Sequence, residues 1–183
     1  MIQRLSDELE SEAWVAFRSL LVDAEQVLGP RDDRFSVVDI VQSDTGPNMK
    51  LDGDEITLIV GPYVQVYPPN LISNIAHETV HVLNPTTGYA SWLEEGVAVH
   101  FELGTIERRF DGAVRRRLMD CLPGSYANAF DDYEKLLEYD CHAGRSVRSV
   151  AGLSGVSRSQ LRKLFPGVSR RLISKFVTRR QMR

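Results

Sequence analysis

The five residues His77-Glu78-Thr79-Val80-His81 decide how the chain around them is expected to fold. On an α-helix, residues four positions apart lie on the same face, so His77 and His81 can direct two imidazoles at one point. Glu78 lies about 100° round the helix, beside that point. Two neutral imidazoles suit Zn²⁺, and an adjacent carboxylate suits general-base work on a metal-bound water. The same motif also occurs by chance on solvated helices, so the flanking sequence has to distinguish these two interpretations.

The flanking sequence predicts a largely buried helix over residues 70–84. Asn70 is a favourable N-cap, and Pro85 cannot continue a helix. The apolar residues between them recur at helical spacing: Ile72, Ile75, Ala76, Val80 and Leu83. A buried histidine needs a partner for its polar ring, so this apolar setting favours a metal site over a solvated face.

A second helix is predicted to begin directly after Ser91. Ser91 followed by Glu94 forms a capping box, in which the Glu94 side chain is expected to bond back to the Ser91 amide. Glu95 is then free to point elsewhere. Gly96 inside a helix costs about 1 kcal/mol relative to alanine. We therefore expect Gly96 to have a packing reason, namely a close approach to the helix that carries His77 and His81.

Upstream of these helices the sequence predicts one more helix and a small sheet. Apolar residues recur at helical spacing over residues 7–28, with Ser6 as N-cap and Gly29-Pro30 as terminator. Three short apolar runs are expected to be strands: residues 35–42, 56–60 and 63–67. The expected fold class is α+β, with a small, mostly antiparallel sheet packed on the two motif helices and a helical C-terminal part.

The two motifs together carry a family resemblance. HETVH followed by Trp92-Leu93-Glu94-Glu95-Gly96 and then Val-Ala resembles the gluzincin metallopeptidases, which combine HExxH with W-L-x-E-G-x-A. The resemblance implies a zinc-dependent peptidase with a peptide or protein substrate. It also implies that three residues bind Zn²⁺ while a fourth, Glu78, is the catalytic residue that activates the attacking water. The implied zinc ligands are His77, His81 and Glu95.

The spacing departs from that of the larger gluzincins, because only 13 residues separate His81 from Glu95. The resemblance is therefore to a minimal form with a compact loop between the helices. The short spacing also raises Glu102 as a rival ligand, two turns beyond Glu95. We prefer Glu95 for its Glu-Gly-x-Ala context, and expect Glu102 to lie at the surface or behind the ligands. His100 is expected not to be a ligand.

The resemblance further implies an oxyanion donor and a strand that binds substrate. Residues 126–133 resemble the Tyr-x-x-Ala helix of the family, and Tyr126 is the preferred donor, ahead of Tyr133 and His142. Each tyrosine could instead simply pack by its ring. The strand expected over residues 63–67 precedes the metal helix, and in gluzincins such an edge strand pairs with an extended peptide.

Charge is distributed unevenly along the chain. All acidic residues precede residue 143, whereas residues 143–183 hold half of the 22 Lys and Arg. We expect a zinc domain over residues 1–142 and a basic helical extension over residues 143–183, packed on the same domain. Residues 146–165 also resemble a helix-turn-helix, with Ala151 on its first helix, so DNA binding is a possible second function.

Composition narrows the class of protein. A hydrophobic content of 43% is ample for a globular core, and no run approaches the ~18 apolar residues of a membrane span. The first residues lack the apolar stretch of a signal peptide. Two cysteines, Cys121 and Cys141, do not make a disulfide framework. We expect a cytoplasmic zinc hydrolase; the alternatives are a DNA-binding regulator and a protein that keeps zinc only for structure.

Overall fold

The computed structural model describes residues 1–179 and has an α+β fold. The strands are β1 (Ile2–Arg4), β2 (Ser36–Ser43), β3 (Asn48–Asp52) and β4 (Glu55–Val60). The helices are α1 (Asp7–Leu28), α2 (Pro68–Val82), α3 (Trp92–Arg109), α4 (Gly112–Cys121), α5 (Gly124–Leu137), α6 (Ala143–Arg148), α7 (Arg158–Leu164) and α8 (Arg170–Phe176). Within residues 1–179, no helix combines the length and apolar character needed to cross a bilayer.

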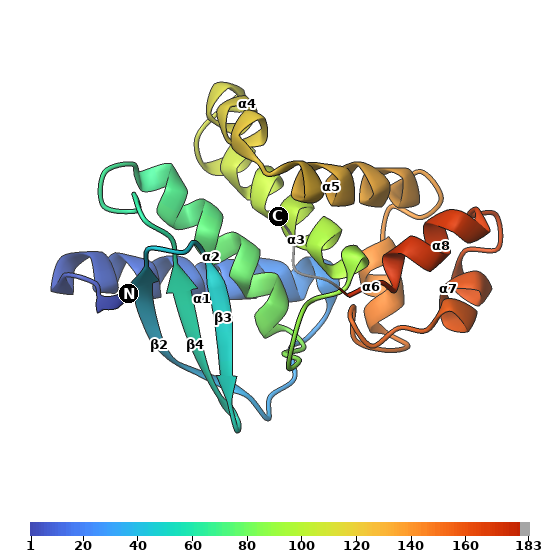
Figure 1. Cartoon of the computed structure of the whole chain (residues 1–183), viewed down its shortest axis with the longest axis horizontal. Coiled ribbons are helices and arrows are strands. Elements are labelled where there is room, and N and C mark those ends of the chain that lie inside the picture. The colour runs from blue at the N-terminus through green and yellow to red at the C-terminus, as the bar shows by residue number, and fades with distance from the viewer. Residues whose placement is uncertain (180–183) are drawn as a thin grey trace.

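The four strands form one mixed sheet in the order β1-β2-β4-β3. The central pair β2 and β4 is parallel, and the two outer pairs are antiparallel, so the expected small, mostly antiparallel sheet is confirmed. Helices α1 and α2 lie against one face of this sheet (Figure 1). Helix α2 packs on β4 and β3, which sets the His77–His81 segment beside the edge strand β3.

Two of the three predicted strands are confirmed, and the third, over residues 63–67, is wrong. This segment is a tight turn in which the backbone N–H groups of Val66 and Tyr67 both donate to the Tyr63 carbonyl. Tyr63 has a φ of 72°, which a strand does not allow. Alternation of tyrosine and valine imitated a strand, but Pro62 and Pro68 confine the segment to a turn. The actual edge strand, β3, was missed because it is short and half polar.

Helix α2 begins earlier than predicted. Its N-cap is Tyr67, Pro68 and Pro69 occupy the first turn, and Asn70 lies inside the helix, so the expectation that Asn70 caps it is wrong. Proline is tolerated there because the first N–H groups of a helix have no intrahelical partner and its φ is already helical. Most of α2 from Ile75 onward is buried, as expected.

Helix α3 begins as predicted, with the Ser91 hydroxyl accepting from the Glu94 amide. The role predicted for Gly96 is wrong. A Cβ at Gly96 would lie 2.5 Å from the Ala129 carbonyl oxygen and 2.9 Å from the Tyr133 Cβ. The glycine therefore allows α5, and not α2, to approach α3 closely.

The C-terminal helices α6, α7 and α8 gather at one end of the molecule (Figure 1). Their apolar side chains, including Leu161 and Phe176, belong to the same core cluster as α1, α2 and α3. Ala151 lies beyond the end of α6, so its predicted place on the first helix of a helix-turn-helix is wrong. Helix α7 begins with a capping box between Ser157 and Gln160.

Candidate metal centre

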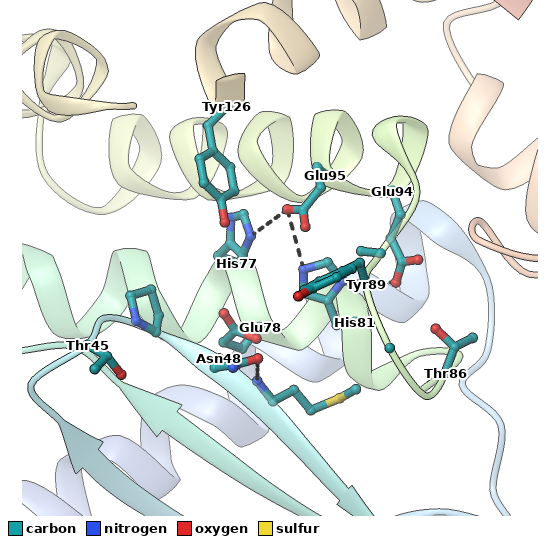
Figure 2. Close-up of a pocket in the computed structure, with 14 residues that line it drawn as sticks. Thr45, Asn48, His77, Glu78, His81, Thr86, Tyr89, Glu94, Glu95 and Tyr126 are labelled. Atoms are coloured by element: carbon teal, nitrogen blue, oxygen red, sulfur yellow. Dashed lines mark hydrogen bonds and ion pairs between the residues drawn. The ribbon is translucent and has the colours of Figure 1, made fainter. Parts of the chain in front are cut away.

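Three buried side chains on two neighbouring helices converge on one point. His77 and His81 come from α2, and Glu95 comes from the first turn of α3 (Figure 2). The Glu95 Oε2 atom lies 3.2 Å from the His77 Nε2 and 3.8 Å from the His81 Nε2. One ligand atom from each residue lies within 4.8 Å of those of the other two, which is close enough to surround a single ion.

The outer nitrogen of each imidazole is held by a second carboxylate. The His77 Nδ1 lies 3.1 Å from the Glu102 Oε2, and the His81 Nδ1 lies 2.9 Å from the Glu94 Oε1. A carboxylate can only accept at Nδ1, so it stabilises the tautomer that carries its proton there. Both Nε2 atoms are then available, with their ring orientations fixed, to face the same point as Glu95.

Each of these outer carboxylates is itself held by a serine. Ser73 donates its hydroxyl proton to Glu102, and Ser154 donates to Glu94. Ser154 also accepts from the Ser91 amide at 2.7 Å. The site therefore contains two similar hydrogen-bond series, each of which runs from a serine through a glutamate to a histidine.

One sequence-based expectation about these glutamates is wrong: Glu94 bonds to His81 and Ser154 instead of the Ser91 amide. Of the two places expected for Glu102, the structure has the one behind the histidine and not the one at the surface, since Glu102 is buried and bonded to His77. The position of Glu102, seven residues after Glu95 on one helix face, was a usable signal. Nothing in the local sequence indicated that Glu94 bonds to His81, because the capping-box pattern already accounted for a glutamate at this position.

Electrostatics make the centre attractive to a cation. Burial lowers the pKa of His77, but its hydrogen bonds with Glu102 and Glu95 outweigh burial and raise that pKa well above its usual value. Burial likewise opposes charge on His81, while the Glu94 hydrogen bond and charge raise its pKa to about 9. Burial raises the pKa of Glu95, yet the two imidazoles bring it below its usual value. The carboxylates therefore stabilise positive charge, either as protons or as a metal.

The donor set fits Zn²⁺. Two imidazole nitrogens and one carboxylate oxygen are a typical three-ligand set for this ion, and each ligand here has the outer hydrogen bond or helix packing that fixes it. His100 is not part of the set, as expected, since its Nδ1 pairs with Glu134 at 2.6 Å. His77, His81 and Glu95 are therefore arranged so that they could hold a metal ion.

Glu78 lies on α2 between the two histidines and faces the same cavity (Figure 2). Glu78 is only 4% exposed. Burial raises the pKa of Glu78, and the nearby charges of His81 and His77 partly counteract this. A buried carboxylate with a raised pKa beside a ligand cluster has the properties of a general base.

Tyr126 is the only one of the three proposed oxyanion donors that lies at the centre. It projects from the first turn of α5, and its ring lies edge-on to His77 with the centroids 5.6 Å apart (Figure 2). Burial and the charge of Glu95 raise the pKa of Tyr126, so its hydroxyl keeps its proton. Tyr133 instead accepts from the Gly144 amide, and His142 is exposed at the start of α6.

The centre opens into a cavity of about 320 Å³. Its walls come from α2, the loop before α3, α5 and the start of β3 (Figure 2). Asn48 and Met49 of β3 line the cavity, and Asn48 lies across it from Tyr126 (Figure 2). A second cavity of about 450 Å³ adjoins the first at His77, Glu78 and Tyr126.

Comparison of the chain with models of protein families, with curated proteins and with solved structures found no match.

Proposed function

We propose that this chain is a zinc-dependent hydrolase of the minimal gluzincin type and that it cleaves peptide bonds. The observation that carries the proposal is the convergence of His77, His81 and Glu95 beside Glu78 at one cavity. These are the four positions to which the HExxH and W-L-x-E-G-x-A resemblance assigns ligands and base. Three protein ligands leave a coordination position open, which is typical of a catalytic zinc site.

The reaction would use the chain's own groups as follows. A bound Zn²⁺ would supply Lewis-acid activation of water and of a substrate carbonyl. Glu78 would accept a proton from the attacking water and pass it to the leaving amine. Tyr126 would donate its hydroxyl hydrogen bond to the oxygen that gains negative charge in the transition state. Glu94 and Glu102 would keep the two imidazoles oriented throughout.

The substrate would lie along β3. The edge strand expected over residues 63–67 is a turn, and β3 takes its place as the strand with an open edge beside the centre. Asn48 and Met49 line the cavity, so an extended peptide paired with this strand would pass the three ligands. This arrangement supports a peptide substrate over a small polar one.

The Glu78→Gln variant tests the proposal. It should keep one zinc per chain and lose hydrolysis by about 10²–10⁴-fold, because general-base catalysis contributes a factor of that size. Metal content and turnover are measured on the same preparation. His81→Ala is the matched control and should lose the metal itself. Unchanged turnover in Glu78→Gln would refute the base assignment, and a zinc-loaded native protein that cleaves no peptide would favour a structural zinc.

The second candidate function is DNA binding by the basic segment. Five cationic side chains on or next to α7 and α8 are exposed: Arg158, Arg162, Lys163, Arg170 and Arg171. The helices are short, however, and Gln160 is occupied in the capping box of α7. Salt-dependent binding to duplex DNA would support this function, and no binding at low salt would exclude it.

A further inference from the structure

We infer that the site acts on the interior of an extended polypeptide and not on its ends. This inference rests on the proposed peptidase function and adds the substrate class. It is carried by the shape of the cleft, the state of its charged groups and the free edge of β3.

The cleft continues past the centre in both directions. The first cavity extends on the His81 side, towards Tyr89 in the loop before α3. The second extends on the His77 side, towards Tyr63 in the turn before α2. Both tyrosines are more than half exposed, so each outer end has an aromatic side chain at the surface. An enzyme that removes terminal residues requires one end to be closed, and neither cavity is closed by the described residues.

The charged groups along the cleft offer no cationic partner to a terminal carboxylate. Among residues 1–179, the charged residues that line the two cavities are glutamates and histidines, and no lysine or arginine lines either one. Each glutamate is committed: Glu95 to the ligand set, Glu94 and Glu102 to the imidazoles, and Glu78 to the proposed base role. A terminal carboxylate would lie among these glutamates with no cationic side chain to pair with, which is unfavourable. An internal segment carries no such charge.

The edge of β3 provides hydrogen bonds that do not depend on a terminus. The Met49 amide donates to the Asn48 side-chain oxygen at 2.8 Å, on the cavity side of the strand (Figure 2). Because alternate residues of an antiparallel pair direct their amides away from the partner strand, Leu51 faces the same free edge. A substrate strand would replace the Asn48 side chain and pair with Met49 and Leu51 through its backbone alone.

The second cavity selects a side chain next to the cleaved bond. The end of α4 and the turn into α5 contribute Leu118, Leu122 and Pro123 to its wall, and Pro62 lies in the wall as well. These groups favour an apolar side chain through burial of its surface. Cys121, exposed at the last position of α4, lies at the same wall and can be changed without disturbing the core.

The first experiment compares peptides with blocked and free ends on the zinc-loaded full chain. Ten-residue fluorogenic peptides that contain one central leucine are made with acetyl and amide ends, and the same sequences are made with a free end. We expect the doubly blocked peptides to be cut at an internal bond, with a kcat/KM within threefold of the free forms. Cleavage restricted to a terminal residue, or a loss of more than tenfold on blocking, would overturn the inference while leaving the peptidase function intact. Cleavage of no peptide at all would refute the proposed function and the inference with it.

The second experiment tests the side-chain preference with Cys121→Lys. The ratio of kcat/KM for a peptide with a central glutamate to that for the leucine peptide should rise at least fivefold, because the new ammonium faces the second cavity. Val150→Lys, which adds the same charge at an exposed position outside the cavities, is the matched control and should leave the ratio unchanged. If the ratio were unchanged in Cys121→Lys, the second cavity would not take part in substrate recognition.

Discussion

Each of the two imidazoles at the centre contacts one carboxylate through Nε2 and a different carboxylate through Nδ1. Both Nε2 atoms face Glu95, while the Nδ1 atoms face Glu102 and Glu94 separately. In the metal-free chain this arrangement stabilises protonated histidines, because three carboxylates outweigh the effect of burial. A metal has to displace these protons, so its affinity should increase with pH.

The first prediction concerns the pH dependence of metal-free stability. The folded-state pKa of His81 is about 9, above its usual 6.5, so its protonation stabilises the fold fully below about pH 6.5. That contribution, at most about 3 kcal/mol, is lost as the pH rises through 9. Urea unfolding in excess chelator between pH 6 and 9.5 should show the decline. The zinc-loaded protein is the control and should lack this loss, since a ligand histidine is already neutral. A metal-free stability that is constant over this range would contradict the electrostatic account of the site.

At the residue scale the sequence predicted the cluster of His77, His81 and Glu95 but not the side chains that support it. The spacing of His77 and His81 is a local property of one helix, and the Glu-Gly context identified Glu95. The helical spacing of Glu95 and Glu102 was a local signal, but Ser154 lies far along the chain from Glu94, and no local pattern records that contact. Only the packing of α2, α3 and the C-terminal segment brings them together.

At the element scale, α3 is the helix that connects the parts of the centre, because it carries Glu95 and contacts both α2 and α5. It packs against α2 on one side and against α4 and α5 on another. Its contact with α5 depends on Gly96, and α5 in turn carries Tyr126. The spacing between α3 and α5 therefore sets the distance between the proposed oxyanion donor and the ligands.

The second prediction is that Gly96→Ala destabilises the fold and displaces Tyr126. The added Cβ would meet backbone and side-chain atoms of α5 at 2.5–2.9 Å, so the helices must separate. Overpacking of this kind costs about 1–3 kcal/mol. The control is Gly104→Ala on the same helix, where the Cβ meets only the end of the Arg108 side chain at 3.4 Å. It should be neutral or stabilising by up to about 1 kcal/mol. Chemical unfolding measures both, and equal effects would show that the contact with α5 is not tight.

Helices were predicted from sequence more reliably than strands, for a physical reason. A cap and an apolar face are local, as Ser6 and Ser91 show, and both were found in their predicted roles. A strand exists only through its partner. Residues 63–67 alternate like a strand but have no partner, whereas residues 48–52 carry a weak pattern and pair with β4.

At the scale of the whole molecule, the C-terminal segment is attached to the start of α3. The Trp92 amide donates to the Thr178 carbonyl, and Asp132 accepts from both the Trp92 indole and Lys175. Arg148 donates to the carbonyls of Leu28, Gly29, Pro30 and Leu83. Two of the basic residues in the C-terminal segment, Arg148 and Lys175, therefore stabilise the fold by bonding to other parts of the chain. The charge asymmetry was visible in the sequence, but these contacts, which join distant segments, were not.

The same attachment extends to the metal centre through Ser154, which leads to the last prediction. Ser154 lies in the turn between α6 and α7 and holds Glu94, which holds His81. Ser154→Ala leaves the buried Glu94 oxygen and the Ser91 amide without this partner, and each unsatisfied group costs about 1–3 kcal/mol. We expect zinc affinity to fall about tenfold, because loss of an outer partner of a ligand has effects of 10–100-fold.

Competition with a chromogenic chelator measures this loss, and the spectrum of the Co²⁺-substituted protein reports whether the ligand geometry has changed. Ser149→Ala is the matched control, since Ser149 is exposed on the same segment and its hydroxyl donates to the nearby Ser146 carbonyl. It should bind zinc as the native chain does. If Ser154→Ala lowered the stability of the metal-free protein but left zinc affinity and the Co²⁺ spectrum unchanged, the contact would be structural alone. A shift in both would show that residues 143–179 hold His81 in place, so that the C-terminal segment forms part of the same functional unit as α2 and α3.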